Sequence, residues 1–434
     1  MTPHPTDDRT DDRTDNGTDD SVHNRAADPA TATRELTDDF DPRAPETFTS
    51  AHELYRGMRE HCPVAHSEGF DGGFWALFRH SDVNRVLRNP DTFTTSVQNT
   101  VPKFAFTGRR PPLHLDPPEH TAYRRVINRF FTPTKMRALH PTVRQLAVEQ
   151  LTPLFEAGAG DISVDYAQKF PALVFAEFFN LPRELSTRIK EISAAYVAAI
   201  IAVDDETVKQ LSGKLYAIAQ DVIDQRRAEP MDPEADLTTA LTQATYEGEP
   251  LPPDMVLGCV RQLLVTGMVA PSVFIGNMFV HLSRDPELQT TLRENPDRIP
   301  AAVEEFLRLY GPYRGMARTA REDVVFDGRL IKAGEPIALV YTSANRDGRV
   351  FPDGENFVFD RPNLSEHISF GAGVHSCPGA PLARMMLTTT LEEALARTDD
   401  FAVTGEIVMA KWAEWGTNSV PMRFVPAGGG ARGA

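Results

Sequence analysis

Residues 370 to 379 read Phe370-Gly371-Ala372-Gly373-Val374-His375-Ser376-Cys377-Pro378-Gly379, and a helical pattern follows them from about Ala380 to Arg397. The glycines allow the backbone to lie close against a flat group, and Cys377 stands just before a helical first turn with unpaired amides. Amide donors at a helix N-terminus favour a thiolate and tune a metal bound to it. Two interpretations are open at this point: a metal-binding cysteine loop, or a glycine-rich turn around an inert buried cysteine. Zinc is disfavoured, because no paired cysteines or histidines stand at ligand spacing.

The loop resembles the haem-binding signature of the cytochrome P450 family, Phe-Gly-x-Gly-x-His-x-Cys-x-Gly, and every fixed position is present. The resemblance extends from about residue 40 to 425. It implies a mainly α fold of the α+β type, with a helical domain, a smaller β-rich region, and haem between a long central helix and the cysteine loop. It implies haem b (iron protoporphyrin IX) as the cofactor and Cys377 as the metal ligand. The other cofactor-binding residues of the loop are then Phe370, Gly371, His375 and Gly379.

A second motif supports this resemblance. Glu305 and Arg308 match the family's Glu-x-x-Arg, and Arg361 falls where the family closes that pair into a buried structural triad. Taken alone, Glu305 and Arg308 are an ordinary pair three residues apart on one helix face.

Three further basic side chains match family positions that hold the haem propionates: His120, Arg124 and Arg318. A carboxylate in a poorly hydrated pocket needs a fixed cation with good hydrogen-bond geometry. His375 joins them in this interpretation. Singly, each of these side chains is more often a solvated surface group.

The central helix departs from the family pattern. The family usually carries an acid and an alcohol that deliver protons, whereas Val269 and Ala270 stand at these positions here. Pro271 removes a backbone donor and is expected to open the helix locally. General acid–base help is worth about 10²–10⁴-fold, or about 3–5 kcal/mol. The catalytic candidates on this helix are Thr266, Gly267, Val269, Ala270 and Ser272.

Three explanations of this departure stay open. In the first, a substrate hydroxyl or ordered waters beside Thr266, Ser272 and the carbonyls freed by Pro271 deliver the protons, and the reaction is hydroxylation or O-dealkylation. Alternatively, the enzyme couples two carbons, or a carbon and a nitrogen, by radical abstraction, or it uses peroxide as the oxidant. The plain structural alternative is that the helix tolerates Val269 and Ala270.

The expected reaction inserts one oxygen atom from O2 into a small hydrophobic or aromatic substrate, because a thiolate-bound haem iron favours breaking the O–O bond. Electrons would come from a separate ferredoxin and NAD(P)H-dependent reductase, and the metabolic role would be natural-product (secondary) metabolism or aromatic catabolism. A non-catalytic haem sensor or carrier is the alternative of another class. The expected pocket residues are mostly apolar and aromatic: Phe104, Phe106, Tyr196 to Ile201, Met268, Val269, Tyr313, Met316, and the stretch from Trp412 to Trp415.

The composition is that of a globular protein of 434 residues with a formal charge of −16. This charge argues against a nucleic-acid or anionic-membrane partner. Three cysteines far apart argue against a disulfide framework and for a reducing cytosol, so a cytoplasmic location is expected. Residues 1–35 form a polar, Asp- and Thr-rich segment expected to be a disordered tail before a single catalytic domain over 36–434.

The uncharged run 262–283 is long enough to cross a bilayer, but its Gly, Pro, Asn and His residues favour a buried core helix. Hydrophobic spacing predicts further helices over 121–131, 142–156, 185–202, 207–227, 254–284, 286–294 and 297–310. A helix over 81–88 is expected to be capped by Ser81. Strands are predicted over 74–78, 336–341, 400–409 and 419–425, with a hairpin over 324–331 turning at Asp327-Gly328 and an irregular stretch over 343–369.

Overall fold

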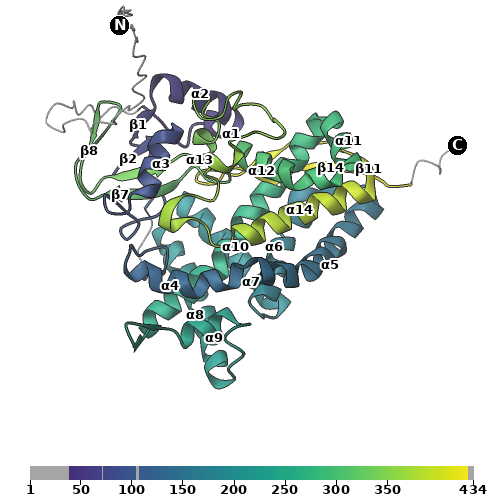
Figure 1. Ribbon diagram of the computed structural model, residues 1–434. Coiled ribbons are helices and arrows are strands. Elements are labelled where there is room, and N and C mark those ends of the chain that lie inside the picture. The colour runs from purple at the N-terminus through teal and green to yellow at the C-terminus, as the bar shows by residue number, and fades with distance from the viewer. Residues whose placement is uncertain (1–38, 71, 104–106, 429–434) are drawn as a thin grey trace, which may run out of the picture.

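The computed structural model describes residues 39–70, 72–103 and 107–428. It is mainly helical, with a smaller β-rich region gathered at one side of the molecule (Figure 1). This confirms the predicted fold class. The predicted N-terminal tail, and the boundary at residue 35, lie outside the described residues.

The helices are α1 (Glu46–Thr49), α2 (Ala51–His61), α3 (His80–Arg88), α4 (Glu119–Asn128), α5 (Pro133–Ala157), α6 (Phe170–Phe178), α7 (Arg183–Ile201), α8 (Asp205–Ala228), α9 (Leu237–Thr242), α10 (Pro253–Arg284), α11 (Pro286–Glu294), α12 (Ile299–Leu309), α13 (Tyr341–Ala344) and α14 (Ala380–Arg397). The strands are β1 (Val64–Ser67), β2 (Phe74–Leu77), β3 (Phe93–Thr94), β4 (Ala159–Asp161), β5 (Thr245–Tyr246), β6 (Glu249–Pro250), β7 (Met316–Ala320), β8 (Val324–Phe326), β9 (Arg329–Ile331), β10 (Pro336–Leu339), β11 (Thr398–Val403), β12 (Val408–Met409), β13 (Thr417–Ser419) and β14 (Pro421–Pro426).

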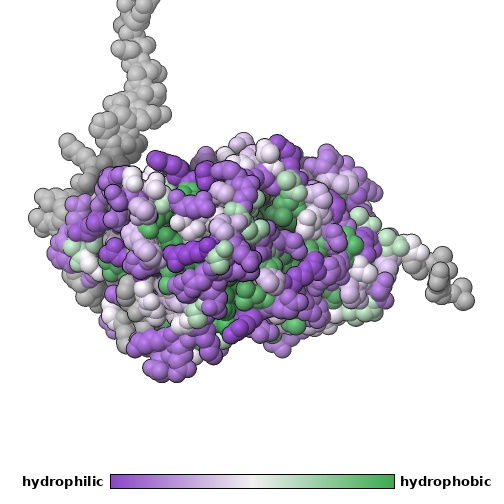
Figure 2. Space-filling model, turned by 90° about the horizontal axis from the view of Figure 1, so that it is seen from below, coloured by the Kyte–Doolittle hydropathy of each residue, from purple (hydrophilic) through white to green (hydrophobic). Residues whose placement is uncertain are grey.

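Helix α10 runs through the middle of the molecule, among α6, α7, α8 and α14 (Figure 1). In the part of the chain that the structure describes, it is the helix long and apolar enough to cross a membrane, but 72% of its most apolar window is buried inside the protein. The surface seen from below is mostly hydrophilic, with apolar side chains in limited areas (Figure 2). The prediction of a buried core helix is therefore confirmed.

The main sheet has the strand order β1-β2-β10-β7-β3. Strand β10 is parallel to β2, with Ile337 opposite Trp75, and antiparallel to β7, with Ile337 opposite Arg318. Strand β10 is therefore the central strand, and β7 lies between it and the edge strand β3. Strand β7 thereby carries Arg318 into the interior, where 6% of its surface is exposed.

Local sequence explains where several helices begin and end. Asp204 and Asp285 accept hydrogen bonds from the first-turn amides of α8 and α11, as N-cap residues do. Helix α5 ends at Gly158, whose φ of 68° is left-handed. The expected Ser81 cap is wrong: α3 begins at His80, whose amide donates to the carboxylate of Asp347, 267 residues later in the chain.

Most predicted elements are present within a few residues of their expected bounds. The hairpin of β8 and β9 turns at Asp327-Gly328, where both residues have positive φ. Strands β1 and β7 and helix α6 were not predicted. The predicted strand over 336–341 ends at Leu339, and Tyr341 begins the short helix α13 instead.

Candidate active site

The cysteine loop lies between the β-rich region and α14. The amide of Cys377 donates to the carbonyl of Phe370 at 2.8 Å, which closes the loop, and α14 begins three residues after the cysteine. Gly373 has a φ of 68°, and a Cβ there would lie 2.5 Å from the carbonyl oxygen of Leu87. Only glycine therefore fits this point of the loop.

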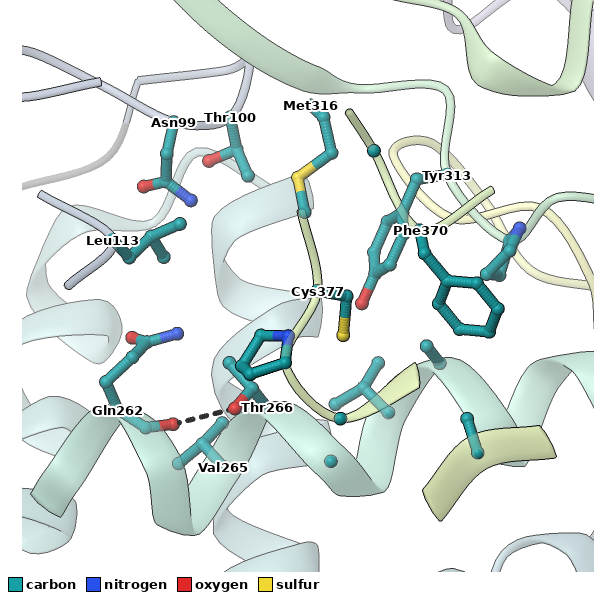
Figure 3. Close-up of a pocket in the computed structure, with 18 of the residues that line it drawn as sticks. Asn99, Thr100, Leu113, Gln262, Val265, Thr266, Tyr313, Met316, Phe370 and Cys377 are labelled. Atoms are coloured by element: carbon teal, nitrogen blue, oxygen red, sulfur yellow. Dashed lines mark hydrogen bonds between the residues drawn. The ribbon is translucent and has the colours of Figure 1, made fainter. Parts of the chain in front are cut away.

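The thiol of Cys377 faces an internal cavity (Figure 3). Its side chain is exposed to the cavity while protein surrounds it on all other sides. Burial raises the pKa of this thiol, and hydrogen bonds from the amides of Gly379 and Ala380 and the charge of Arg124 oppose that rise. The amides favour the thiolate as the sequence predicts, but burial outweighs them, so the free thiol keeps its proton at neutral pH.

Four basic side chains from three segments reach the same cavity: His120 and Arg124 from α4, Arg318 from β7 and His375 from the cysteine loop. His120 and Arg124 are four residues apart and so share one helix face. The rings of His120 and His375 pack edge to face with centroids 4.3 Å apart.

Three of these groups, His120, Arg124 and Arg318, lack anionic partners among the described residues where they meet the cavity. Among the described residues, Nε2 of His120 is buried and makes no hydrogen bond. Arg318 donates to the carbonyl of its own neighbour Ala317, and within the same ranges neither Arg318 nor Arg124 forms an ion pair with a carboxylate. Buried cations in this state are suited to an acidic group that enters from outside the chain.

Asp116 holds His375 in place. Its Oδ1 lies 3.8 Å from Nε2 of His375, and it also accepts from Arg321 and from the amide of Thr95. Burial opposes the charge of Asp116, but hydrogen bonds from His375, Thr94 and Thr95 and the charge of Arg321 outweigh it and lower its pKa. Asp116 was not predicted as a site residue, although it lies four residues before His120.

Helix α10 forms the wall of the cavity with Thr266, Gly267, Val269, Ala270 and Pro271. The Oγ1 of Thr266 donates to the carbonyl of Gln262 at 3.1 Å (Figure 3). The helix stays continuous through Pro271, so the expected local opening does not interrupt it. Because proline has no N–H, the carbonyl of Gly267 loses its helical donor.

Phe175 of α6 packs directly on this wall. A Cβ on Gly267 would lie 1.3 Å from Cζ of the Phe175 ring. The absence of a side chain at residue 267 is therefore what allows α6 to close the cavity here.

The cavity has a volume of about 390 Å³ and is lined mainly by apolar side chains. Tyr313 and Met316 line it as predicted, as do Tyr196, Val197, Ile200 and Ile201 of α7. Glu414, within the predicted stretch from Trp412 to Trp415, also lines it, as do polar residues that the sequence analysis did not suggest, among them Asn99, Arg110, Arg261 and Gln262.

Several predicted positions do not line the cavity, among them Met268, Ser272, Trp412 and Trp415. Met268 is buried on another face of α10, and Ser272 turns its hydroxyl back to the carbonyl of Met268 at 2.5 Å. Trp415 packs against the His52 ring with centroids 4.7 Å apart, while its neighbour Glu414 faces the cavity. Phe104 and Phe106 lie outside the described residues.

Glu305, Arg308 and Arg361 form a buried cluster below the cavity. Arg308 donates to both carboxylate oxygens of Glu305 at 2.8 and 2.7 Å, and Arg361 donates to Glu305 at 3.3 Å. Arg308 also donates to the carbonyls of Asn345, Gly354 and Asn356. The cluster thus ties α12 to the irregular stretch that leads into the cysteine loop.

Known proteins are similar to this chain in both sequence and architecture. The family model described as Cytochrome P450 matches residues 75–399. The chain belongs to the cytochrome P450 family. Cytochrome P450 130 of Mycobacterium tuberculosis is 33% identical over 384 residues, which cover 86% of this chain and 94% of that protein.

Two further P450s extend the comparison. Mycinamicin IV hydroxylase/epoxidase of Micromonospora griseorubida is 34% identical and covers 86% of this chain and 96% of its own length. The solved structure of cytochrome P450 CYP109Q5 from Chondromyces apiculatus superposes with a TM-score of 0.79 at 28% identity, covering 89% of this chain and 98% of that one. This P450 is accordingly an oxidoreductase of the monooxygenase class.

The P450 family implies a haem-thiolate cofactor, and the residues of this chain fit one. The cavity brings a cysteine thiol together with basic side chains that lack anionic partners: His120, Arg124 and Arg318. A porphyrin offers the matching groups, a metal for the thiolate and two carboxylates for the cations.

Proposed function

We propose that this P450 uses haem b, whose iron Cys377 would bind, to insert one oxygen atom from O2 into a small hydrophobic or aromatic molecule. The reaction is hydroxylation or O-dealkylation. The observation that carries the proposal is the position of the Cys377 thiol, which opens into the same cavity as an apolar wall of α10 and a set of basic side chains. When bound, a thiolate-ligated haem supplies O–O bond cleavage and oxidation of the substrate.

The chain's own residues would prepare this site in two ways. Cys377 gives up its Sγ proton when it binds the metal, and the amides of Gly379 and Ala380 stabilise the resulting anion. Arg124, Arg318 and the two histidines would hold the propionates by charge-assisted hydrogen bonds. His375 keeps its orientation through Asp116.

Proton delivery must do without the family's acid and alcohol, because Val269 and Ala270 line the cavity at those positions. The polar groups left on this wall are the hydroxyl of Thr266 and the carbonyl of Gly267 that Pro271 frees. We propose that a substrate hydroxyl or an ordered water beside these groups carries the proton. We assign Ser272 no part, because it does not line the cavity, whereas Thr266 does.

The apolar pair Val269 and Ala270 also favours a second candidate, oxidative coupling of two carbons, or of a carbon and a nitrogen, by radical abstraction. This reaction needs no oxygen insertion and depends less on a proton relay. Peroxide-driven oxidation is the third reaction mode that the apolar pair allows. The products separate the three, since only the first adds an atom from ¹⁸O2.

Electrons would reach the site from a separate ferredoxin and an NAD(P)H-dependent reductase in the cytoplasm, with a role in secondary metabolism or aromatic catabolism. Purified protein, reduced and treated with carbon monoxide, is expected to show the thiolate-type absorption, and Cys377→Ala is expected to lose it. Retention of that absorption in the variant would refute the ligand assignment. Substrate-dependent NAD(P)H consumption with oxidised product separates an enzyme from a haem sensor or carrier.

The proton route has its own test. Ala270→Thr places an alcohol where the family usually has one, and it is expected to lower the fraction of electrons lost as peroxide. The measurement is peroxide formed per NAD(P)H consumed, with a bound substrate, in both proteins. An unchanged ratio would show that the proton route lies away from residue 270.

A further inference from the structure

The cavity has a polar end. Asn99, Arg110, Tyr196, Arg261 and Gln262 all line it, and they come from the segment before α4, from α7 and from the first half of α10. Asn99, Leu113 and Gln262 lie together to one side of Cys377, with Phe370 on the other side (Figure 3). The remainder of the lining is mainly apolar, so the cavity has one polar end and is otherwise apolar.

Arg261 is the most unusual member of this cluster. Only 1% of its surface is exposed, and within the described ranges its Nε and Nη2 make no hydrogen bond and no carboxylate forms an ion pair with it. Its guanidinium lies over the rings of Tyr196 and Tyr216, with its Cζ 4.9 and 5.7 Å from their centroids. Burial lowers its pKa to about 10, which leaves the group charged at neutral pH.

A second buried cation stands beside it. Arg110 donates to the hydroxyl of Tyr196 at 3.4 Å and contacts Nε2 of His114 at 3.3 Å. Burial, followed by the charges of Arg110 and Arg261, lowers the pKa of His114 to about 3. The histidine is thus kept neutral by a local excess of positive charge.

The neutral side chains of the cluster present donors to the cavity. Oδ1 of Asn99 is hydrogen-bonded to Nε2 of His114 at 2.8 Å, which turns the amide nitrogen of Asn99 inward. The amide nitrogen of Gln262 points into the same space (Figure 3). Two amide donors and a buried guanidinium with unused N–H groups make a site for an anionic acceptor.

We propose that this polar end binds the carboxylate of the substrate, so that the substrate is a small hydrophobic or aromatic carboxylic acid oxidised at a carbon remote from its acid group. The proposal rests on the function proposed above and specifies its substrate class. Arg261 precedes Val269 by eight residues on the continuous helix α10, which is about 12 Å along the axis. The carboxylate therefore binds well away from the thiol end, and the apolar part of the molecule spans the distance between them.

Stacking on two tyrosines gives Arg261 a structural role, but it does not account for the rest of the cluster. Ring faces attract a cation without using its N–H groups. The Nε and Nη2 of Arg261 still lack acceptors among the described residues, and Oε1 of Gln262 is buried there without a hydrogen-bond partner. The cavity lining also contains an acidic residue, Glu414, but this residue forms no ion pair with Arg261. It belongs to the segment that pairs with Tyr313, whose ring lies beside Cys377 (Figure 3).

The test compares acids with their own esters in the haem-loaded protein. The probes are alkanoates from hexanoate to dodecanoate, phenylalkanoates, and the methyl ester of each, with Kd measured by calorimetry. At least one acid is expected to bind about tenfold or more tightly than its ester, as charge-assisted hydrogen bonds provide. Arg261→Leu is expected to remove this preference, whereas the exposed-arginine control Arg188→Leu keeps it.

Two results would overturn the proposal: no acid in the panel binds more tightly than its ester, or Arg261→Leu keeps the full preference. Where Arg261→Leu does not fold, Gln262→Leu removes one donor without changing the charge and is expected to weaken acid binding by about two- to tenfold. An unchanged acid preference in that variant counts against the proposal in the same way. The absorption spectrum of the reduced, carbon monoxide-treated protein is recorded separately. It shows whether the haem-thiolate proposal fails, independently of whether the carboxylate-binding proposal fails.

Discussion

Replacing Glu305 by glutamine should destabilise this P450 strongly, although the two side chains have almost the same shape. Glu305 is 1% exposed and accepts hydrogen bonds from Arg308, from Arg361 and from the amide of Val358. Glutamine keeps one acceptor oxygen and removes the negative charge. Two buried guanidinium groups then lose the carboxylate that neutralises them.

The size of the effect follows from this burial. Breaking a buried ion pair by removing one partner costs about 3–5 kcal/mol, because the remaining charge is left uncompensated. The unfolding entropy is about 2.1 cal/mol/K per residue near 60 °C, or about 0.9 kcal/mol/K for a chain of this length if it unfolds cooperatively. The unfolding temperature should therefore fall by about 3–6 °C.

Differential scanning calorimetry of the haem-loaded protein measures this shift. Asp360→Asn is the matched control, because it makes the same acid-to-amide change in an ion pair whose carboxylate is 76% exposed. Such exposed pairs contribute about 0–1 kcal/mol, so the control should unfold within about 1 °C of the parent. The reasoning is refuted if Glu305→Gln also unfolds within 1 °C of the parent.

Two further predictions concern the cavity. Gly267→Ala drives a methyl group into the ring of Phe175 and should lower the free energy of unfolding, measured in urea, by about 1–3 kcal/mol. Gly57→Ala is the control and should not destabilise the protein, because nothing lies within 4 Å of a Cβ at that position. Equal effects of the two substitutions would contradict the packing argument. Burial and neighbouring arginines lower the pKa of His114 to about 3, so its contribution to stability is complete above pH 6.5 and is lost as the pH falls toward 3. Between pH 6.5 and 5 the parent should lose about 2 kcal/mol more stability than His114→Asn. Replacing His61, which is 82% exposed, is the control and should leave the parent's pH dependence intact. If the stability of His114→Asn falls with pH in parallel with that of the parent, the assignment of this pH dependence to His114 is wrong.

The sequence predicted the groups that lie in compact motifs. The cysteine loop, the pair of Glu305 and Arg308 and the basic residues of α4 each occur within a short stretch, so their residue types and spacing were visible without the fold. Helix α2 was missed although its buried Ala51, Tyr55 and Met58 recur at helical spacing, whereas two other missed elements, β7 and α6, lack a hydrophobic period. Strand β7 reads Met-Ala-Arg-Thr-Ala, and α6 is apolar on nearly every side, so neither shows alternation or a helical stripe.

The pocket lining was predicted less well because it depends on which side of an element faces inward. Met268 and Val269 are neighbours on α10, yet only Val269 reaches the cavity, and Trp415 turns away while Glu414 turns toward it. Arg261 carried a usable signal: it is the charged residue that borders the uncharged run of α10. Burial of a cation at that point depends on the packing of α7 and α8 against α10, which the sequence of one helix does not show.

The parallel pairing of β10 with β2 has a consequence for how the protein is made. Trp75 lies opposite Ile337, so about 260 residues separate the two partners along the chain. At a synthesis rate of 5–20 residues per second, the hairpin of β1 and β2 leaves the ribosome about 10–50 s before its neighbour exists. Throughout that interval the edge of β2 that later pairs with β10 is unpaired and can pair with other chains. This early hairpin is therefore a segment to which a chaperone that prevents aggregation would bind.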